Sequence, residues 1–322
     1  MIRRKYIVAA AATSIALLLA ACSSETPETT SPEPGGSDPG AVEDTVLIGL
    51  ITKFPVDFYD IMVDAAKEWD AAEDGAEVIY AQGQSGTDDE GVIAAIQSMV
   101  TQGVDAIAIT PTSPAVQDEL QKAVDAGIKV VLIDNDIPDW DGKTAVVATD
   151  NKAGGVLAGQ WFVDNVPAGS KVALLQGVLG NPSLDARIDG FRETVGDHVT
   201  IVAETATDCD QTKGLNAAQD IIAANPDLDA IYGACGPPIV GALEAVKSAG
   251  LEDTVIVGFD ASPDEVAAII AGTQTGSVAQ FPAKMGSMGV QAAFDAVLGN
   301  AVEANIDTGT EMVTAANAAD FQ

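Results

Sequence analysis

Basic residues are scarce in this sequence. Lys and Arg together number 15 against 48 Asp and Glu, which gives the 322-residue chain a formal net charge of −33 at pH 7. Nucleic-acid binding needs a basic face that neutralises phosphates, so nucleic acid is not expected as a partner. The acidic residues are spread along the chain. We therefore interpret them as a source of solubility and not as a dedicated binding surface.

Catalytic and metal-binding motifs are also missing. The one histidine, His198, follows Gly196 and Asp197 in a predicted turn and is expected at the surface. No Gly-x-Ser-x-Gly elbow, Walker loop or dinucleotide fingerprint occurs. The aspartate-rich segment 134–139 has proline at its fifth position and no glycine at its sixth, so it does not fit an EF-hand calcium loop. We expect no metal, no cofactor and no enzymatic activity.

Long hydrophobic runs are absent after the first 21 residues. Those residues carry a basic cluster at 3–5 and an apolar stretch from 7 to 19, which is too short for a typical membrane span. The stretch ends in Leu-Ala-Ala-Cys at Cys22, which resembles a bacterial lipobox. We expect residues 1–21 to be removed and Cys22 to be lipidated, so that the exported protein is anchored to the membrane. The alternative is an ordinary cleaved signal that happens to precede a cysteine.

The segment 22–43 is rich in Ser, Thr, Pro, Gly and Glu and has no apolar periodicity. This composition is typical of a flexible tether.

From residue 46 onward, apolar runs alternate with segments of helical periodicity. Strands are predicted at 46–52, 77–82, 105–110, 129–134, 145–149, 171–176, 200–204, 229–234, 254–259, 277–280 and 311–314. Helices are predicted at 58–72, 88–101, 115–126, 151–163, 183–195, 211–224, 237–249, 263–271 and 284–298. This alternation predicts right-handed βαβ units and mainly parallel sheets. Because the pattern restarts after residue 149, we expect two α/β lobes.

Two of these strands form a matched pair. The runs 129–136 and 254–260 are both continuously apolar and both reach an aspartate, Asp134 and Asp260. Such runs are typical of strands buried between helical layers. In open α/β sheets, ligands bind beyond the carboxyl ends of the strands. The pairing therefore favours two acids facing one ligand, whereas for either strand alone the aspartate could simply cap the next helix or turn.

Polar and aromatic side chains gather at the predicted strand ends. They are Lys53, Phe58, Tyr59, Gln82, Thr110, Asp134, Asn135, Gln176, Arg187, Asp208, Asp210, Cys235, Phe259, Asp260 and Gln280. Carboxylates accept hydrogen bonds from hydroxyls, guanidinium donates to them, and aromatic rings pack on C–H faces, so the set suits a neutral polyhydroxylated ligand. Beyond the signal the chain has only two arginines. We expect Arg187 at the ligand, with a structural ion pair as the alternative, and Arg192 on a solvated face.

Short matches in one consistent order identify a resemblance. They are Phe58-Tyr59, Thr110-Pro111-Thr112, Asp134-Asn135, 148–151, 175–177, 213–216, 257–264 and 279–282. Over residues 46–314 the chain resembles the periplasmic sugar-binding proteins of ribose-transporter type, the substrate receptors of ABC importers. The resemblance implies the type I periplasmic binding protein fold, with two flavodoxin-like (Rossmann-like) lobes joined by crossovers near Thr149, Gln280 and Asp307. The N-terminal lobe would comprise 44–149 plus 281–306, and the C-terminal lobe 150–280 plus 307–322.

The resemblance also implies a ligand site. Phe58 and Tyr59 would pack on the sugar, and the aspartate pair would bind its hydroxyls. The full expected set is Phe58, Tyr59, Thr110, Asp134, Asn135, Thr149, Val178, Arg187, Cys209, Cys235, Phe259, Asp260 and Gln280. Four of these positions depart from ribose binders.

Asn135 stands where ribose binders carry a second arginine, and Thr110 where they often carry asparagine. Cys209 replaces a stacking phenylalanine and Cys235 an asparagine. These departures favour another pentose, a larger or modified sugar, or an acyclic polyol.

The two remaining cysteines are expected to pair. With Cys22 lipidated, Cys209 and Cys235 are the only thiols left in an exported protein. The resemblance places both beside the same ligand, so we predict a disulfide in the wall of the site. The alternative is two reduced, small buried residues.

The expected function is that of an extracytoplasmic, lipid-anchored and monomeric receptor that delivers a small neutral monosaccharide or polyol to an ABC permease. Two alternatives stay open. One is a receptor for another small polar solute, such as a signalling molecule. The other is a surface glycosidase that uses Asp134 and Asp260 as paired acids.

Overall fold

The computed structural model describes residues 45–251 and 253–322. The predicted signal peptide, tether and lipidation site at Cys22 lie outside the described residues. Both sheets of the protein belong to one compact unit, Glu43–Gln322. In the part of the chain that is described, no helix combines the length and the apolar character needed to cross a membrane.

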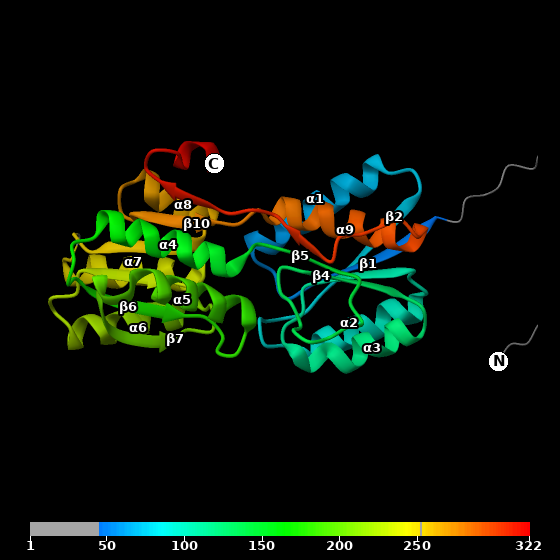
Figure 1. Ribbon diagram of the computed structural model, residues 1–322, viewed down its shortest axis with the longest axis horizontal. Helices are drawn as coiled ribbons and strands as arrows, with labels where there is room; N and C mark the ends of the chain where they lie inside the picture. Colours follow the sequence, from blue (N-terminus) through cyan, green and yellow to red (C-terminus); the bar gives the residue numbers. More distant parts are fainter. Residues whose placement is uncertain (1–44, 252) are drawn as a thin grey trace, which may run out of the picture. The chain divides into compact units, whose positions relative to one another are not determined.

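Two six-stranded sheets organise the described residues (Figure 1). The first sheet has the order β11 (Asn305–Asp307), β5 (Ala145–Ala148), β4 (Lys129–Ile133), β3 (Ala106–Ile109), β1 (Val46–Thr52) and β2 (Ala76–Gln82). The second has the order β12 (Glu311–Thr314), β10 (Gly276–Ala279), β9 (Val255–Asp260), β8 (Ala230–Gly233), β6 (Lys171–Gln176) and β7 (Thr200–Ala206). All neighbours are parallel except β10 and β12. The α/β fold with two similar sheets is therefore as predicted.

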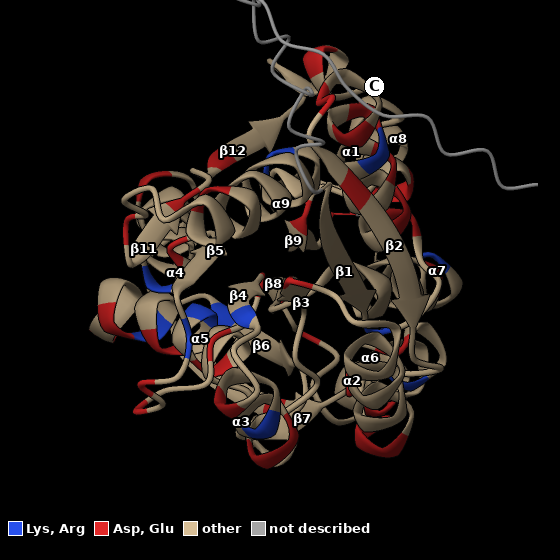
Figure 2. Ribbon diagram, turned by 90° about the vertical axis from the view of Figure 1, so that its right-hand side faces the viewer, with Lys and Arg blue, Asp and Glu red and all other residues tan. Residues whose placement is uncertain are grey.

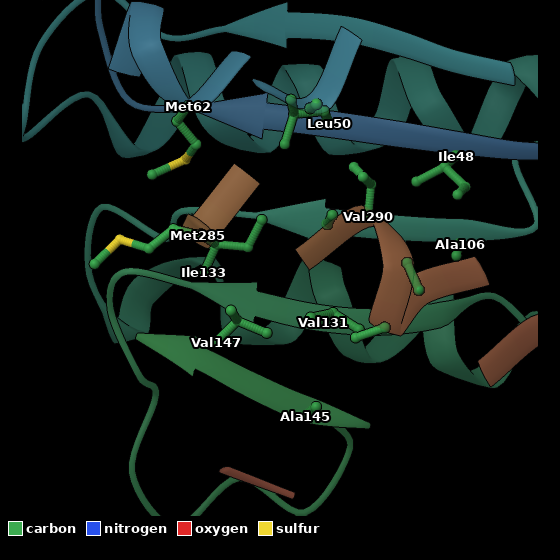
Figure 3. Close-up of a cluster of buried hydrophobic side chains, with 14 of the residues drawn as sticks. Ile48, Leu50, Met62, Ala106, Val131, Ile133, Ala145, Val147, Met285 and Val290 are labelled. Carbon is green, nitrogen blue, oxygen red and sulfur yellow. The ribbon is translucent and has the colours of Figure 1, made fainter. Parts of the chain in front are cut away.

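The helices of the first sheet cover both of its faces. Helices α1 (Asp57–Ala72) and α9 (Pro282–Leu298) pack on one face, and α2 (Asp89–Gln102) and α3 (Gln117–Asp125) on the other. Figure 3 shows the first of these cores, where Met62 of α1 and Met285 and Val290 of α9 lie over Leu50 and Val131 of the strands. Continuous apolar strands fit this arrangement because both of their faces are buried.

The second sheet is covered in the same way. Helices α4 (Asn151–Asn165) and α5 (Pro182–Val195) pack on one face, α6 (Gln211–Ala224) and α7 (Gly236–Ala249) on the other, and α8 (Pro263–Ile270) lies near β10. Short 3-10 turns occupy Pro114–Val116, Gly196–His198 and Ala318–Phe321. Aromatic side chains fill the α4–α5 core, where Phe191 stacks on Tyr232 with 4.2 Å between ring centroids and meets Phe162 edge-on.

The chain passes between the two sheets three times. The crossings lie between β5 and α4, between β10 and α9, and between β11 and β12. Strand β11 is not among the predicted strands, because it has only three residues and only one of them is apolar. Acidic side chains are distributed over elements of both sheets, with few basic ones among them (Figure 2).

Candidate functional site

The matched aspartates share an uncommon backbone conformation. Asp134 directly follows β4 and has φ of 66°, and Asp260 ends β9 with φ of 101°. Positive φ is rare for residues other than glycine and clusters at functional sites. Asp260 does not cap the helix that follows its strand, because Ser262 is the N-cap of α8. Its Oδ2 accepts instead from the backbone N–H of Gly236, the first residue of α7. Within the part of the chain that is described, the Asp134 side chain accepts only from the side chains of Tyr59 and Asn135. The capping alternative for these two residues is therefore wrong.

A cavity of about 260 Å³ lies at these strand ends. This volume is at or just below the lower end of the range for small-molecule pockets, so the cavity suits a small ligand. The predicted residues that line it are Phe58, Tyr59, Asp134, Asn135, Val178, Arg187, Cys209, Cys235, Asp260 and Gln280. Residues from both sheets thus meet around one space, as the paired strands predict.

Three predicted residues do not line the cavity. Thr110 is fully buried, and its N–H donates to the Ile51 carbonyl in the sheet. Thr149 lies at the first crossing, where its hydroxyl is within hydrogen-bonding distance of Thr308 and Gly309. Phe259 is buried in the α4–α5 core. Of the three, Phe259 lies directly behind the wall, because its ring contacts the guanidinium of Arg187, which lines the cavity.

Arg187 is held in place from several directions. Its Nε donates to Asn151 Oδ1 at 2.8 Å, and its Nη1 donates to the Ala234 carbonyl at 2.8 Å and to Asp260 Oδ1 at 3.1 Å. The guanidinium also lies 3.9 Å from the centroid of the Phe259 ring. Ligand contact and a structural ion pair were alternatives for this residue. The structure shows the ion pair, and the same side chain lines the cavity.

The Asp260 carboxylate accepts three hydrogen bonds from protein donors. Besides Arg187 and Gly236, the Gln280 amide donates to its Oδ1 at 2.6 Å. Burial raises the pKa of Asp260, although the Arg187 guanidinium opposes that shift. The other polar atom of this amide, Gln280 Oε1, is buried and accepts no hydrogen bond from the described residues.

An aromatic wall comes from the start of α1. Tyr59 meets Phe54 and Phe58 edge-on, with centroid distances of 5.4 and 5.3 Å. The Tyr59 hydroxyl donates to Asp134 Oδ2 at 3.2 Å. Burial, together with Asp134, raises the Tyr59 pKa well above its usual value, so this phenol remains a donor. Phe54 was not among the predicted residues.

The second lobe contributes contacts through the N-terminus of α5. Asn181, the N-cap residue, accepts from the N–H groups of Ser183 and Leu184, and its own amide donates to Asn135 Oδ1 at 2.9 Å. The Ser183 hydroxyl donates to the Asp134 carbonyl at 3.4 Å. Sequence reasoning missed both residues, although Asn-Pro-Ser directly after a predicted strand and loop is a helix-start signal.

The predicted disulfide is present. Cys209 and Cys235 are bonded, with their Cα atoms 5.8 Å apart, and both line the cavity. Cys209 lies in the loop after β7 with φ of 54°, and Cys235 is the N-cap residue of α7. The bond therefore ties the ends of two second-lobe strands together at the ligand wall.

Lys53 also lines the cavity and is only 6% exposed. It belongs to the residues noted at strand ends but was not predicted as a ligand contact. Among the described residues, no group of three or more His, Cys, Asp or Glu side chains is placed to hold a metal ion.

Comparison with known proteins gives consistent matches. A model of the periplasmic binding protein domain matches residues 48–301. The ribose import binding protein of Bacillus subtilis is 30% identical over 298 residues, covering 92% of this chain and 95% of that protein. A Mycobacterium smegmatis ABC transporter solute binding protein with bound glycerol is 30% identical with a TM-score of 0.80, covering 86% of this chain and 96% of that one. A Bacillus halodurans solute binding protein with bound myo-inositol shares the fold, with a TM-score of 0.82 at 23% identity over 87% of this chain and 98% of that one.

Proposed function

Because the chain belongs to the periplasmic binding protein family, we propose that it is an extracytoplasmic receptor for a small neutral sugar or polyol. It would bind this ligand in the cavity between Asp134 and Asp260 and deliver it to an ABC permease. The arrangement of the cavity is the observation that carries the proposal. Two aspartates and an arginine from different sheets meet beside an aromatic wall in a small space. These are the groups that a polyhydroxylated ligand requires.

The charges of the cavity favour a neutral ligand. Its buried cations, Lys53 and Arg187, are equalled in number by two acids, Asp134 and Asp260, although only Arg187 and Asp260 form an ion pair. The exposed side chains of Asp57, Asp208 and Asp264 also line it. An acidic ligand would meet this negative surface as well as the overall charge of −33.

The disulfide favours a ligand other than ribose. In the resemblance to ribose binders, Cys209 takes the position of a stacking phenylalanine, and here it is bonded to Cys235. Two sulfurs offer a compact apolar surface but no ring face. A polyol or a differently substituted sugar fits such a wall, because neither depends on stacking from that side.

The anchor and the domain boundaries belong to the same proposal. Lipidation at Cys22 would hold a monomeric receptor at the outer face of the cell membrane, with residues 22–43 as tether. The lobes would be 44–149 plus 281–306 and 150–280 plus 307–322. The sheet membership of β11 and β12 supports this division.

Thermal unfolding in the presence of candidate ligands tests the function. We expect one or more of D-ribose, D-arabinose, D-allose, myo-inositol and glycerol to raise the Tm in a concentration-dependent way, because a ligand of the folded state stabilises it by RT ln(1 + [L]/Kd). The responding compound should be recovered unchanged after incubation. Breakdown of a glycoside would instead support the glycosidase alternative, and no response to any sugar or polyol would contradict the proposal.

A further inference from the structure

Lys53 is a buried cation without a protein partner. It follows β1 and lines the cavity, and 6% of the residue is exposed. None of the ion pairs formed by the described residues includes it, and its ammonium donates none of their side-chain hydrogen bonds. An ammonium in a mostly buried side chain opposes folding when it has no acceptor, because the charge has lost part of its hydration without gaining a partner.

Burial lowers the pKa of Lys53, and Asp134 is the acidic residue whose charge raises it, yet the two side chains form no ion pair. The protein donors to the Asp134 side chain, Tyr59 and Asn135, both bind Oδ2. Oδ1 accepts nothing from the described residues. One cavity is thus lined by both an unused donor on Lys53 and an unused acceptor on Asp134.

We propose that Lys53 is a ligand-binding residue that determines specificity, and that its ammonium and Asp134 Oδ1 bind the same hydroxyl group of the ligand. The ammonium donates to the hydroxyl oxygen, and the hydroxyl donates to the carboxylate. A single oxygen that makes both bonds holds its partners up to about 5.5 Å apart, which fits two charges that do not touch. The inference rests on the proposed function and adds a definite requirement on the ligand.

That requirement narrows the chemical class. A carboxylate would accept from Lys53 but would face Asp134 with a like charge and no proton to donate. A cationic amine would be repelled by Lys53 in the same way. An ether oxygen satisfies only Lys53. A free hydroxyl satisfies both groups. The ligand is therefore a neutral sugar or polyol with at least one free hydroxyl at this position.

Lys53→Met tests the proposal, because methionine keeps most of the side-chain volume and removes the charge and the donor. We expect it to raise the Tm of the ligand-free protein and to weaken binding of the best-responding compound by about tenfold or more, as for a hydrogen bond to a charged group. The matched control is Lys67→Met, which removes an exposed lysine paired with Asp64 and should change neither quantity. Lys53→Gln is the second variant, in case methionine is not tolerated.

Mono-deoxy analogues of the responding compound provide the second measurement. Removing the hydroxyl that Lys53 binds should weaken binding to the wild type and make it insensitive to Lys53→Met. A Lys53→Met protein that binds the parent compound as tightly as the wild type, or that is less stable without ligand and loses affinity equally for every analogue, overturns the inference and leaves the receptor function standing. A wild type that responds to no sugar or polyol overturns the receptor function, and the inference with it.

Discussion

Arg187 and Asp260 form an ion pair across the inner wall of the cavity, with Nη1 3.1 Å from Oδ1 and side chains that are 3% and 15% exposed. The pair joins α5 to the end of β9. Removing one partner of a pair buried this deeply lowers the stability of the fold, because the remaining charge is neither hydrated nor paired. Binding and stability are therefore linked at this point of the structure.

Arg187→Ala is expected to lower the free energy of unfolding by about 3–5 kcal/mol, the usual cost of breaking a buried pair. It should also weaken ligand binding by roughly 1.5–3 kcal/mol. Urea unfolding and calorimetry measure the two effects. Arg192→Ala is the control, since its pair with Glu204 is exposed and should contribute at most about 1 kcal/mol. Equal effects of the two variants would contradict the assignment.

Asp134→Asn isolates the charge of the first aspartate. Asparagine tolerates the positive φ of this position and can still accept from the Tyr59 hydroxyl, so the fold should be little affected. Ligand affinity should fall by roughly 1.5–3 kcal/mol, because a hydrogen bond to a charged acceptor becomes a neutral one. The control is Asp136→Asn, a partly exposed carboxylate paired with Lys143 and not among the residues that line the cavity. Unchanged affinity in Asp134→Asn would move the hydroxyl-binding acid elsewhere.

Glu265 makes stability depend on pH. It is fully buried, accepts from Ser262, Gln274 and Ser277, and has its pKa raised from 4.5 to about 7, chiefly by burial and then by Asp260. The folded state therefore holds a proton between about pH 4.5 and 7 that the unfolded state has released. Stability from this group should fall as pH rises through that window, by up to about 3 kcal/mol, and stay constant above it.

Comparing the wild type with Glu265→Gln isolates the pH dependence of stability that Glu265 causes. Urea unfolding between pH 4 and 8 should show a difference in the free energy of unfolding that changes with pH, moving in favour of the variant as the pH rises. Other carboxylates cancel in the difference. A difference that is constant across the whole range would show that Glu265 does not titrate there.

The Cys209–Cys235 disulfide should contribute roughly 2–4 kcal/mol to stability, as expected for a loop with a sequence separation of 26. Reduction should lower the Tm of the wild type and leave the Tm of a Cys209→Ala/Cys235→Ala variant unchanged. Titration of unfolded, unreduced protein from an oxidising compartment should find no free thiol from this pair. Two free thiols per delipidated chain would exclude the bond in solution.

Cys22 should carry lipid when the full chain is produced in a bacterium that lipidates exported proteins. Mass spectrometry of the membrane fraction measures this directly, and Cys22→Ala is the control. A soluble wild-type product with an unmodified Cys22 would argue against the tethered receptor.

The fold was predictable from the sequence because burial of both sheet faces leaves a visible pattern. Short, largely apolar runs rich in β-branched residues, such as 129–133 and 255–259, are typical of strands between helical layers. The same runs end at the carboxyl edge of a sheet, so Asp134 and Asp260 were predicted together. Strand β11 was not predicted because three residues are too few to show an alternation of apolar and polar side chains.

The predicted ligand contacts and the residues that line the cavity differ where the sequence does not show which way a side chain points. Thr110 and Phe259 sit at predicted strand ends, but in a strand one residue more or less turns the side chain to the other face. Lys53 was passed over because a lysine is normally solvated, and only the folded chain shows its burial. The Asn181–Asn135 contact joins residues far apart in sequence, and local patterns carry no information about it.

The three crossings have a consequence for how the protein is made. Helix α9 fills one face of the first sheet and β11 completes its edge, yet both are synthesised after nearly all of the second sheet. Helix α1 can pack on the strands of the first sheet earlier, but it lacks its α9 neighbour until residues 282–298 have emerged. Chains of this kind cannot finish their first lobe during translation, whereas most multidomain proteins fold from the N-terminus onward. If the chain is exported as proposed, this order of synthesis would leave the first lobe incomplete until the C-terminal segment is available.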